Sequence, residues 1–317
     1  MRADYAIHEG LLTPAIGPVL WTDLDHPSNT EEASLEDLLK VDLPTREDMA
    51  EIESSSRIYA DGPALLLTAS LLSGSETERP LLAPVTFVLH PERLVTIRYH
   101  TPSAFKSFLV QAARSRAGIT DPLSLLLALL EAVVDRLADV IEREGKALDS
   151  IATEVFAASG GVRKRPGALR FVIGRIGQRG ELNAQIRDSL ASLDRISGHL
   201  AQFPGRHGIS QENKDQALTL VADIRSLTEH ASSMSGRTAF LLDATLGLVN
   251  LEQNDIIKFF SVVAVAFLPP TLVGTIYGMN FASMPELAQP WGYPAALAAM
   301  VVSGLLPYLW FKWRGWF

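Results

Sequence analysis

Two long stretches without a charged side chain lie near the C-terminal end of this 317-residue chain. The first runs from Phe259 to Pro285 and the second from Leu287 to Phe311, so Glu286 alone separates them. Each exceeds the roughly 20 residues that a transmembrane helix needs. A carboxylate costs about 3 kcal/mol at the centre of a bilayer, which places Glu286 in an external loop. The pattern predicts a hairpin of two membrane helices, at 255–280 and 292–311, joined by a loop at 281–291.

Basic residues at the outer flanks of the hairpin predict its orientation. Lys258 lies at the start of the first span, and Lys312 and Arg314 follow the second. Because positively charged flanks stay on the cytoplasmic side, we expect both termini in the cytoplasm, 281–291 outside, and 312–317 as a basic cytosolic tail. A pair of buried core helices in a soluble protein is the alternative explanation for the two apolar stretches.

One side of the first predicted span carries small and polar side chains among apolar neighbours. They recur at steps of three and four residues, so they share one helix face. The members of this stripe are Asn254, Ile257, Ser261, Ala264, Leu268, Thr271 and Thr275. On a membrane helix, such a stripe is explained either by packing between helices or by the lining of a water-filled pore.

The tripeptide Gly278-Met279-Asn280 at the outer end of the span favours the pore. Lipid tolerates a bare carboxamide and an irregular backbone only where protein or a water-filled cavity receives them. Two helices cannot enclose a water-filled pore, so the pore hypothesis requires several copies of the chain around a common axis. We therefore expect a homo-oligomer.

The rest of the chain is predicted to form a cytosolic body with two parts. Residues 1–118 alternate short apolar runs with turn signals, which predicts an α/β domain. Its strands are expected at 19–24, 64–72, 84–89 and 94–98, and its helices at 31–40 and 46–55. Residues 119–254 keep a helical period and predict a helical hairpin and a stalk. The helices there are expected at 123–155, at 168–202, and from about 210 without a break into the first membrane span.

Composition narrows the function. The net charge of −8 argues against nucleic acid as a partner and suits a cationic ligand. The chain has no cysteine, which excludes disulfides and thiolate zinc sites. Its seven histidines are scattered, and neither a Ser/His/Asp spacing nor a phosphate-binding loop occurs. We therefore expect no enzyme, no catalytic residues and no organic cofactor.

The C-terminal third resembles the CorA family of divalent-cation transporters, which carry magnesium, cobalt and nickel. The motifs that carry this resemblance are Asn250-Leu251-Glu252-Gln253-Asn254, Phe267-Leu268-Pro269-Pro270-Thr271-Leu272, Tyr277-Gly278-Met279-Asn280-Phe281, Met284-Pro285-Glu286-Leu287 and Gly292-Tyr293-Pro294. Looser matches occur earlier, in the same order. They are Trp21-Thr22-Asp23-Leu24, Glu51-Ile52-Glu53 with Arg57, and Arg98.

The resemblance implies a homopentameric funnel of α+β cytosolic domains and long stalk helices in the bacterial inner membrane. The first membrane helix of each subunit lines the pore, and Gly278-Met279-Asn280 forms the outer selectivity filter. An inhibitory Mg²⁺ site joins Asp243 to Glu51 of a neighbouring subunit, where an aspartate is common. Of the matching pore positions, Phe260 and Thr275 differ from the residues often found there. The matching positions are Asn254, Ile257, Phe260, Leu268, Thr271 and Thr275.

The function implied by the resemblance is channel-like influx of hydrated Mg²⁺, with Co²⁺ and Ni²⁺ also admitted and intracellular Mg²⁺ controlling the gate. The residues suit this ion, because Mg²⁺ dehydrates reluctantly and a ring of Asn280 carboxamides offers neutral oxygens to its water shell. Two alternatives stay open. One is a zinc transporter of the same architecture, although neither the stripe nor the loop supplies the nitrogen and sulfur ligands that zinc favours. The other is a membrane-tethered scaffold that conducts nothing.

Overall fold

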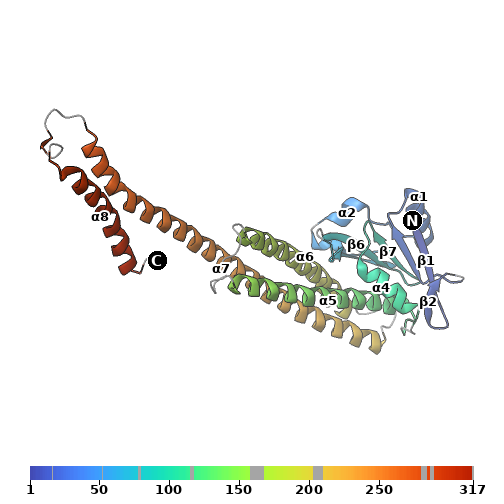
Figure 1. The fold of residues 1–317 in the computed structure, drawn as a ribbon. Helices are drawn as coiled ribbons and strands as arrows, with labels where there is room; N and C mark the ends of the chain where they lie inside the picture. The colour runs from blue at the N-terminus through green and yellow to red at the C-terminus, as the bar shows by residue number, and fades with distance from the viewer. Residues whose placement is uncertain are drawn as a thin grey trace. The chain divides into compact units, whose positions relative to one another are not determined.

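The chain folds into two compact units, Met1–Leu242 and Asp243–Phe317 (Figure 1). The computed structural model describes residues 1–15, 17–51, 53–77, 80–114, 118–157, 168–202, 210–279, 284–285 and 289–315. The first unit holds a mixed β-sheet and a bundle of long helices. The second unit holds two apolar helical segments, and one long helix, α7, contributes to both units.

A seven-stranded sheet organises the first unit, in the order β2-β1-β3-β7-β6-β5-β4. Its strands are β1 Arg2–His8, β2 Leu11–Pro14, β3 Trp21–Asp25, β4 Ile58–Asp61, β5 Ala64–Ser73, β6 Leu81–Leu89 and β7 Leu94–Arg98. Only β3 and β7 run parallel, with Trp21 opposite Leu94. The other neighbours are antiparallel. The sheet is therefore an antiparallel meander joined to an N-terminal hairpin through one parallel pair.

Eight helices occur in the described part of the chain. They are α1 Asn29–Leu39, α2 Arg46–Ala50, α3 Ser54–Arg57, α4 Ser103–Ala112, α5 Pro122–Ala157, α6 Ala168–Gln202, α7 Gln211–Tyr277 and α8 Gly292–Trp313. Helices α1 and α2 each begin with a capping box, in which the first-turn acid bonds back to the cap. The pairs are Ser28 with Glu31 and Thr45 with Asp48.

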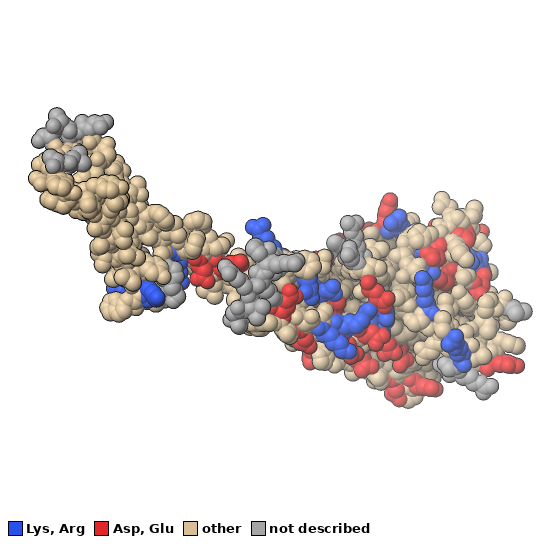
Figure 2. All heavy atoms as spheres, in the orientation of Figure 1, with Lys and Arg blue, Asp and Glu red and all other residues tan. Residues whose placement is uncertain are grey.

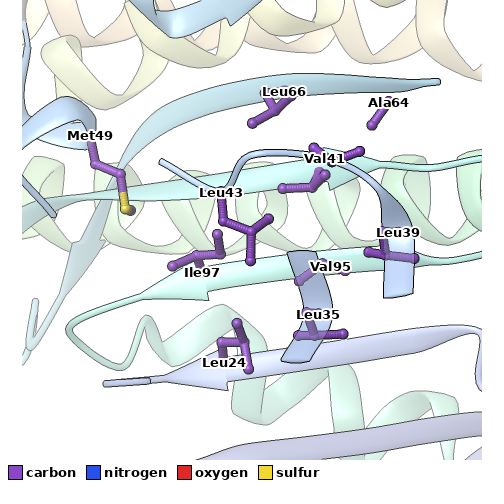
Figure 3. Packing of buried hydrophobic residues seen from close by; sticks show 11 residues of the cluster. Leu24, Leu35, Leu39, Val41, Leu43, Met49, Ala64, Leu66, Val95 and Ile97 are labelled. Atoms are coloured by element: carbon purple, nitrogen blue, oxygen red, sulfur yellow. The ribbon is translucent and has the colours of Figure 1, made fainter. Parts of the chain in front are cut away.

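The period-two alternation of the strands divides the core of the first unit between the two faces of the sheet. On one face, Leu24, Val95 and Ile97 pack with Leu35 and Leu39 of α1 (Figure 3). All five side chains are nearly or fully excluded from solvent. This face is closed by α1 and by the segment that follows it.

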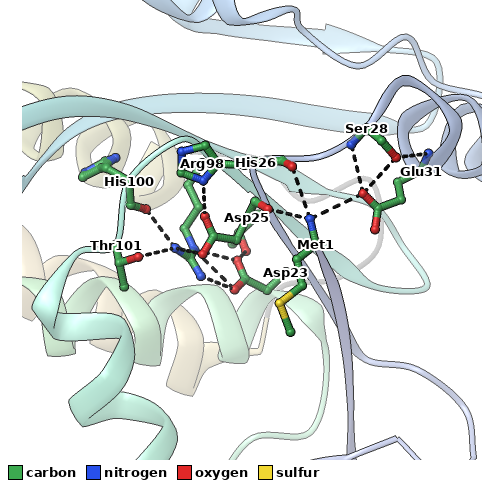
Figure 4. A network of polar contacts seen from close by, with 10 residues as sticks. Met1, Asp23, Asp25, His26, Ser28, Glu31, Arg98, His100 and Thr101 are labelled. Carbon is green, nitrogen blue, oxygen red and sulfur yellow. Dashed lines mark hydrogen bonds and ion pairs between the residues drawn. The ribbon is translucent and has the colours of Figure 1, made fainter.

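The other face carries a buried polar network beneath α4. Trp21, which is fully buried, stacks on Tyr5 at 4.9 Å and donates its indole N–H to Thr96 Oγ1 at 3.0 Å. Thr96 in turn donates to Asp23 Oδ1 at 2.7 Å, and Arg98 Nη2 pairs with Asp23 Oδ2 at 2.9 Å (Figure 4). Because each buried charge is paired and hydrogen-bonded, this face tolerates an ion pair inside the sheet.

Helices α5, α6 and the first part of α7 form the bundle of the first unit, and polar contacts join them. Arg179 of α6 pairs with the buried Glu144 of α5 at 2.7 Å. Asn183, also on α6, donates to the Ala231 carbonyl oxygen of α7 at 2.9 Å. The long helices predicted at 123–155, at 168–202 and from about 210 are confirmed as α5, α6 and α7.

The prediction for the α/β domain missed β4 Ile58–Asp61 and α4 Ser103–Ala112, and it differs from the structure in two further places. The single helix predicted at 46–55 is two short helices, because Glu51 adopts an extended conformation with φ −60° and ψ 143°. The N-terminal hairpin β1–β2 was not predicted. Its two-residue connection, Glu9-Gly10, has positive φ at both positions (54° and 81°), as a type I′ hairpin turn requires. The strands expected at 64–72 and 94–98 are confirmed as β5 and β7, and the one at 84–89 falls within β6.

Candidate ion pathway

Two helices of the second unit, α7 and α8, are long and apolar enough to cross a membrane. Little of either apolar stretch is buried in the chain, which distinguishes both from core helices of a soluble protein. On the face in Figure 2, the hairpin carries charged side chains only toward its ends. Asp255 and Lys258 form an i,i+3 ion pair at 3.6 Å at the start of the first span. At the end of the second, the Arg314 guanidinium lies 4.8 Å from the Trp310 ring.

Small residues set the contact between the two membrane segments. A Cβ added to Gly304 of α8 would stand 3.2 Å from both the Ala266 carbonyl oxygen and Pro270 Cγ of α7. A Cβ added to Gly274 of α7 would stand 3.2 Å from Met300 Cε of α8. Close approach of backbones at small residues is typical of helix pairs in membranes. We call this contact, formed by Ala266, Pro270, Gly274, Met300 and Gly304, the hairpin seam.

The predicted pore stripe lies on the opposite side of α7 from the hairpin seam. Ile257 of the stripe and Ala266 of the seam are nine residues apart, which is about two and a half turns at 3.6 residues per turn. The extra half turn places the two residues on opposite sides of the helix. Side chains of the stripe are exposed, whereas Val262 toward the seam is 7% exposed. Packing against α8 therefore does not account for the stripe. The exposed side chains are those of all seven stripe members (Asn254, Ile257, Ser261, Ala264, Leu268, Thr271 and Thr275) and that of Phe260, a further pore position that the resemblance implies.

The two threonines of the stripe have their hydroxyl hydrogens occupied. Thr271 Oγ1 donates to the Phe267 carbonyl oxygen at 2.8 Å, and Thr275 Oγ1 donates to the Thr271 carbonyl oxygen at 2.8 Å. A hydroxyl has one donor and two acceptor lone pairs, so each oxygen keeps only acceptor capacity toward the exposed side. The waters around a cation turn their hydrogens outward. This side of α7 therefore offers acceptors to a hydrated cation.

Helix α7 ends just before the predicted filter. The Gly278 N–H donates to the Gly274 and Thr275 carbonyl oxygens at 3.0 and 3.2 Å, and the Met279 N–H donates to the Ile276 carbonyl oxygen at 3.2 Å. These shared and three-residue bonds tighten the last turn. Met279 is 45% exposed. Asn280, and Glu286 of the external loop, lie outside the described residues.

The two carboxylates of the predicted regulatory site are exposed and lie in different units. Asp243 is on α7 in the second unit, and Glu51 follows α2 in the first. The Glu51 backbone is held by Arg57, whose Nε donates to the Glu51 carbonyl oxygen at 2.8 Å. Within one chain, no group of three or more potential metal ligands occurs among the described residues.

An acidic cluster lies between α5 and α7, and sequence reasoning missed its α7 member, Asp223. Partial burial raises the pKa of Asp135, and the negative charges of Glu131, Asp139 and Asp223 raise it further. The four-residue steps from Glu131 to Asp139 mark one face of α5 in the sequence. Asp223, however, comes from α7, and no local pattern connects it to the other three.

Comparisons with known proteins agree on one family. Residues 17–313 match the profile of the CorA-like Mg²⁺ transporter protein family. The magnesium transport protein CorA of Mannheimia succiniciproducens is 32% identical over 301 residues, which cover 95% of this chain and 93% of that protein. The one from Pasteurella multocida is 33% identical over 301 residues with the same coverage.

Two solved structures share the fold. The complete structure of the CorA magnesium transporter from Methanocaldococcus jannaschii superposes with a TM-score of 0.79 at 19% identity, covering 100% of this chain and 98% of that chain. The full-length CmaX protein superposes with a TM-score of 0.69 at 17% identity, covering 99% and 97%. The architecture therefore extends over the whole chain.

Proposed function

Because this chain belongs to the CorA-like Mg²⁺ transporter family, we propose that it forms a magnesium channel that admits the hydrated ion. The observation that carries the proposal is the exposed stripe on α7, which lies opposite the hairpin seam. A helix whose partner covers one side is free to present its other side to a pore axis.

The chemistry of the stripe suits an ion that keeps its water. Mg²⁺ dehydrates reluctantly and keeps several waters in protein sites. Thr271 and Thr275 present acceptor oxygens, and the stripe contains no carboxylate. Conduction needs sites attractive enough to enter and weak enough to leave, a balance that neutral oxygens meet. A filter of Gly278, Met279 and Asn280 would add carboxamide oxygens at the outer mouth, and Co²⁺ and Ni²⁺ of similar hydrated size would also pass.

The pore requires several subunits, because one hairpin encloses nothing. We propose a homopentamer in the bacterial inner membrane, with both termini in the cytoplasm and five copies of α7 around the axis. Ile257, Phe260 and Leu268 are 61%, 65% and 66% exposed in the single chain. In the assembly they would form an apolar constriction that closes by losing its water.

Intracellular Mg²⁺ would regulate this constriction through subunit contacts. Five copies of a chain with a net charge of −8 carry −40, so carboxylates that meet across subunits repel. Mg²⁺ bound between Asp243 of one subunit and Glu51 of the next would neutralise them and hold the closed state. When internal Mg²⁺ falls, the contacts loosen and the constriction hydrates.

The test is Mg²⁺ flux into liposomes that contain the purified protein, comparing wild type with Asn280→Ala and Asn29→Ala. Asn29 is exposed on α1 and serves as the matched control. We expect Asn280→Ala to abolish flux while native mass spectrometry still finds the pentamer, and Asn29→Ala to behave as wild type. Normal flux in Asn280→Ala would remove the filter assignment.

Competition distinguishes the remaining alternatives in the same liposomes. A magnesium channel takes up Mg²⁺ in the presence of equimolar Zn²⁺, whereas a zinc transporter of the same architecture takes up Zn²⁺ in preference. A membrane-tethered scaffold admits neither ion. Absence of both Mg²⁺ and Zn²⁺ flux would therefore contradict the proposal.

A further inference from the structure

A basic cavity in the first unit is lined by none of the residues assigned above to the ion path. It has a volume of about 500 Å³, and residues of α3, β4, β5, α6 and α7 line it. Three of its lining residues are arginines from three different elements: Arg57 of α3, Arg195 of α6 and Arg225 of α7. We propose that this cavity binds an anion that bears phosphate groups.

Each guanidinium is placed to offer donors to a ligand. Arg57 is anchored at one edge, where Nε donates to the Glu51 carbonyl oxygen at 2.8 Å and Nη1 to Ser70 Oγ at 3.2 Å. A guanidinium carries more N–H groups than these two bonds use, and the remaining ones are available to the cavity. Arg195 makes no hydrogen bond or ion pair with the described residues. Arg225 Nε forms an ion pair with Asp194 Oδ1 at 3.8 Å, a separation too long for a hydrogen bond, so its N–H groups remain available as donors.

Guanidinium groups outnumber carboxylates among the described residues that line the cavity. Asp194 is the one carboxylate among the described lining residues, against three guanidinium groups. Burial and the positive charge of Arg195 both lower the pKa of Arg57, so these two cations repel each other. Such a cluster is notable in a chain of net charge −8. A bound anion would relieve the repulsion.

The shape and lining of the cavity indicate the class of anion. Guanidinium groups match the oxygens of phosphate in paired hydrogen bonds, which favours phosphate over a small spherical anion. The volume falls in the range of small-molecule sites, which favours a phosphoester or polyphosphate over a single phosphate. None of the described lining residues is Phe, Tyr or Trp, so stacking of a nucleobase would have to use the His199 imidazole or a guanidinium plane. Recognition would rest on the phosphate groups.

The test is isothermal titration calorimetry of the full-length protein in detergent and Mg²⁺-free buffer. Pyrophosphate, ATP and inorganic phosphate are the three probes. We expect pyrophosphate to saturate at one site per chain, phosphate to bind more weakly, and added salt to weaken both. ATP that binds as tightly as pyrophosphate identifies the phosphate chain as the recognised part. If ATP binds much more tightly than pyrophosphate, the cavity also recognises the nucleoside, and the proposed site includes more than the phosphate contacts.

Arg195→Ala is the diagnostic variant, because the side chain is exposed and its removal should not disturb the fold. Loss of one charge-assisted hydrogen bond should weaken pyrophosphate binding about tenfold or more. Arg187→Ala is the control, since Arg187 is an exposed arginine on the same helix outside the cavity. It should bind within about twofold of wild type.

Two outcomes would overturn the proposal. Equal weakening by Arg195→Ala and Arg187→Ala would show non-specific attraction to a basic surface. Absence of saturable binding to wild type, with the pentamer intact, would show that the cavity is not a phosphate-anion site. Neither outcome affects the proposed Mg²⁺ conduction, which depends on residues of the second unit.

Discussion

Gly304 of α8 lies against Ala266 of α7 so closely that a Cβ on Gly304 would stand 3.2 Å from the Ala266 carbonyl oxygen. That carbonyl lacks its usual helical partner, because residue 270 is a proline and has no N–H. The same Pro270 ring lies 3.2 Å from the position of the added Cβ. The Ala266 carbonyl oxygen therefore faces α8 at Gly304, which has no side chain.

This contact predicts that Gly304→Val destabilises the hairpin. The added side chain meets backbone and a proline ring, neither of which moves as a flexible side chain would, and overpacking costs about 1–3 kcal/mol. Gly247→Val is the control, since nothing lies within 4 Å of a Cβ there. Thermal unfolding of the detergent-solubilised protein should show a lower Tm for Gly304→Val only. Equal Tm values for the two variants would contradict a tight seam.

The hydroxyl geometry predicts that Thr271→Val lowers Mg²⁺ flux about tenfold or more. Valine keeps the shape of threonine but removes the acceptor oxygen in every subunit, and a barrier about 1.4 kcal/mol higher slows passage tenfold. Thr271→Ser keeps the oxygen and should conduct within a few-fold of wild type. Liposome flux measures both. Full activity in Thr271→Val would place the ion path elsewhere.

Regulation predicts that Asp243→Asn channels close only at higher internal Mg²⁺. The neutral carboxamide cannot supply the charge that holds Mg²⁺ between subunits. Flux into liposomes that hold increasing internal Mg²⁺ gives the inhibition curve. Asp188→Asn, at an exposed aspartate on α6, controls for the change of charge. If the Asp243→Asn curve coincides with that of wild type, Asp243 is not part of the sensor.

A buried histidine predicts acid sensitivity of the first unit. His100 is 6% exposed, and its Nε2 must donate to the Leu71 carbonyl oxygen, 3.0 Å away. Its Nδ1 is buried without a hydrogen-bond partner among the described residues. Burial lowers the pKa of His100, and the nearby charge of Arg98 lowers it further. The folded state therefore resists a proton that the unfolded chain accepts near its ordinary pKa of about 6.5.

The sign of the effect follows from this difference. Stability is full above about pH 6.5 and falls as the pH drops below that value, because the unfolded chain then binds more protons. The Tm of wild type should be lower at about pH 5.5 than at about pH 7.5. His100→Gln keeps an N–H donor without titrating and should show a smaller difference. His8→Gln, at an exposed position, is the control and should show the same change in Tm with pH as wild type. If the Tm of His100→Gln also changes with pH as much as that of wild type, the prediction is contradicted.

The two apolar helical segments of the second unit, the long helices and most strands could be predicted from the sequence, because each depends on local composition. Hydropathy over a span, helical period over many turns and alternation along a strand are read one segment at a time. The β1–β2 hairpin was not predicted because its strands mix charged and apolar residues. The Glu9-Gly10 turn was the only sequence signal for it. The interruption between α2 and α3 at Glu51 was not predicted because the tertiary fold overrides local helical propensity there.

Sequence alone determined that α7 carries a stripe of small and polar groups, because spacing places residues on one helix face. It could not determine which side of α7 the second span covers. That depends on the fit between two surfaces, and here small residues on both helices allow the backbones to approach at the side opposite the stripe. The bonds that turn Thr271 and Thr275 into pure acceptors were likewise decided by side-chain rotation, which no spacing encodes.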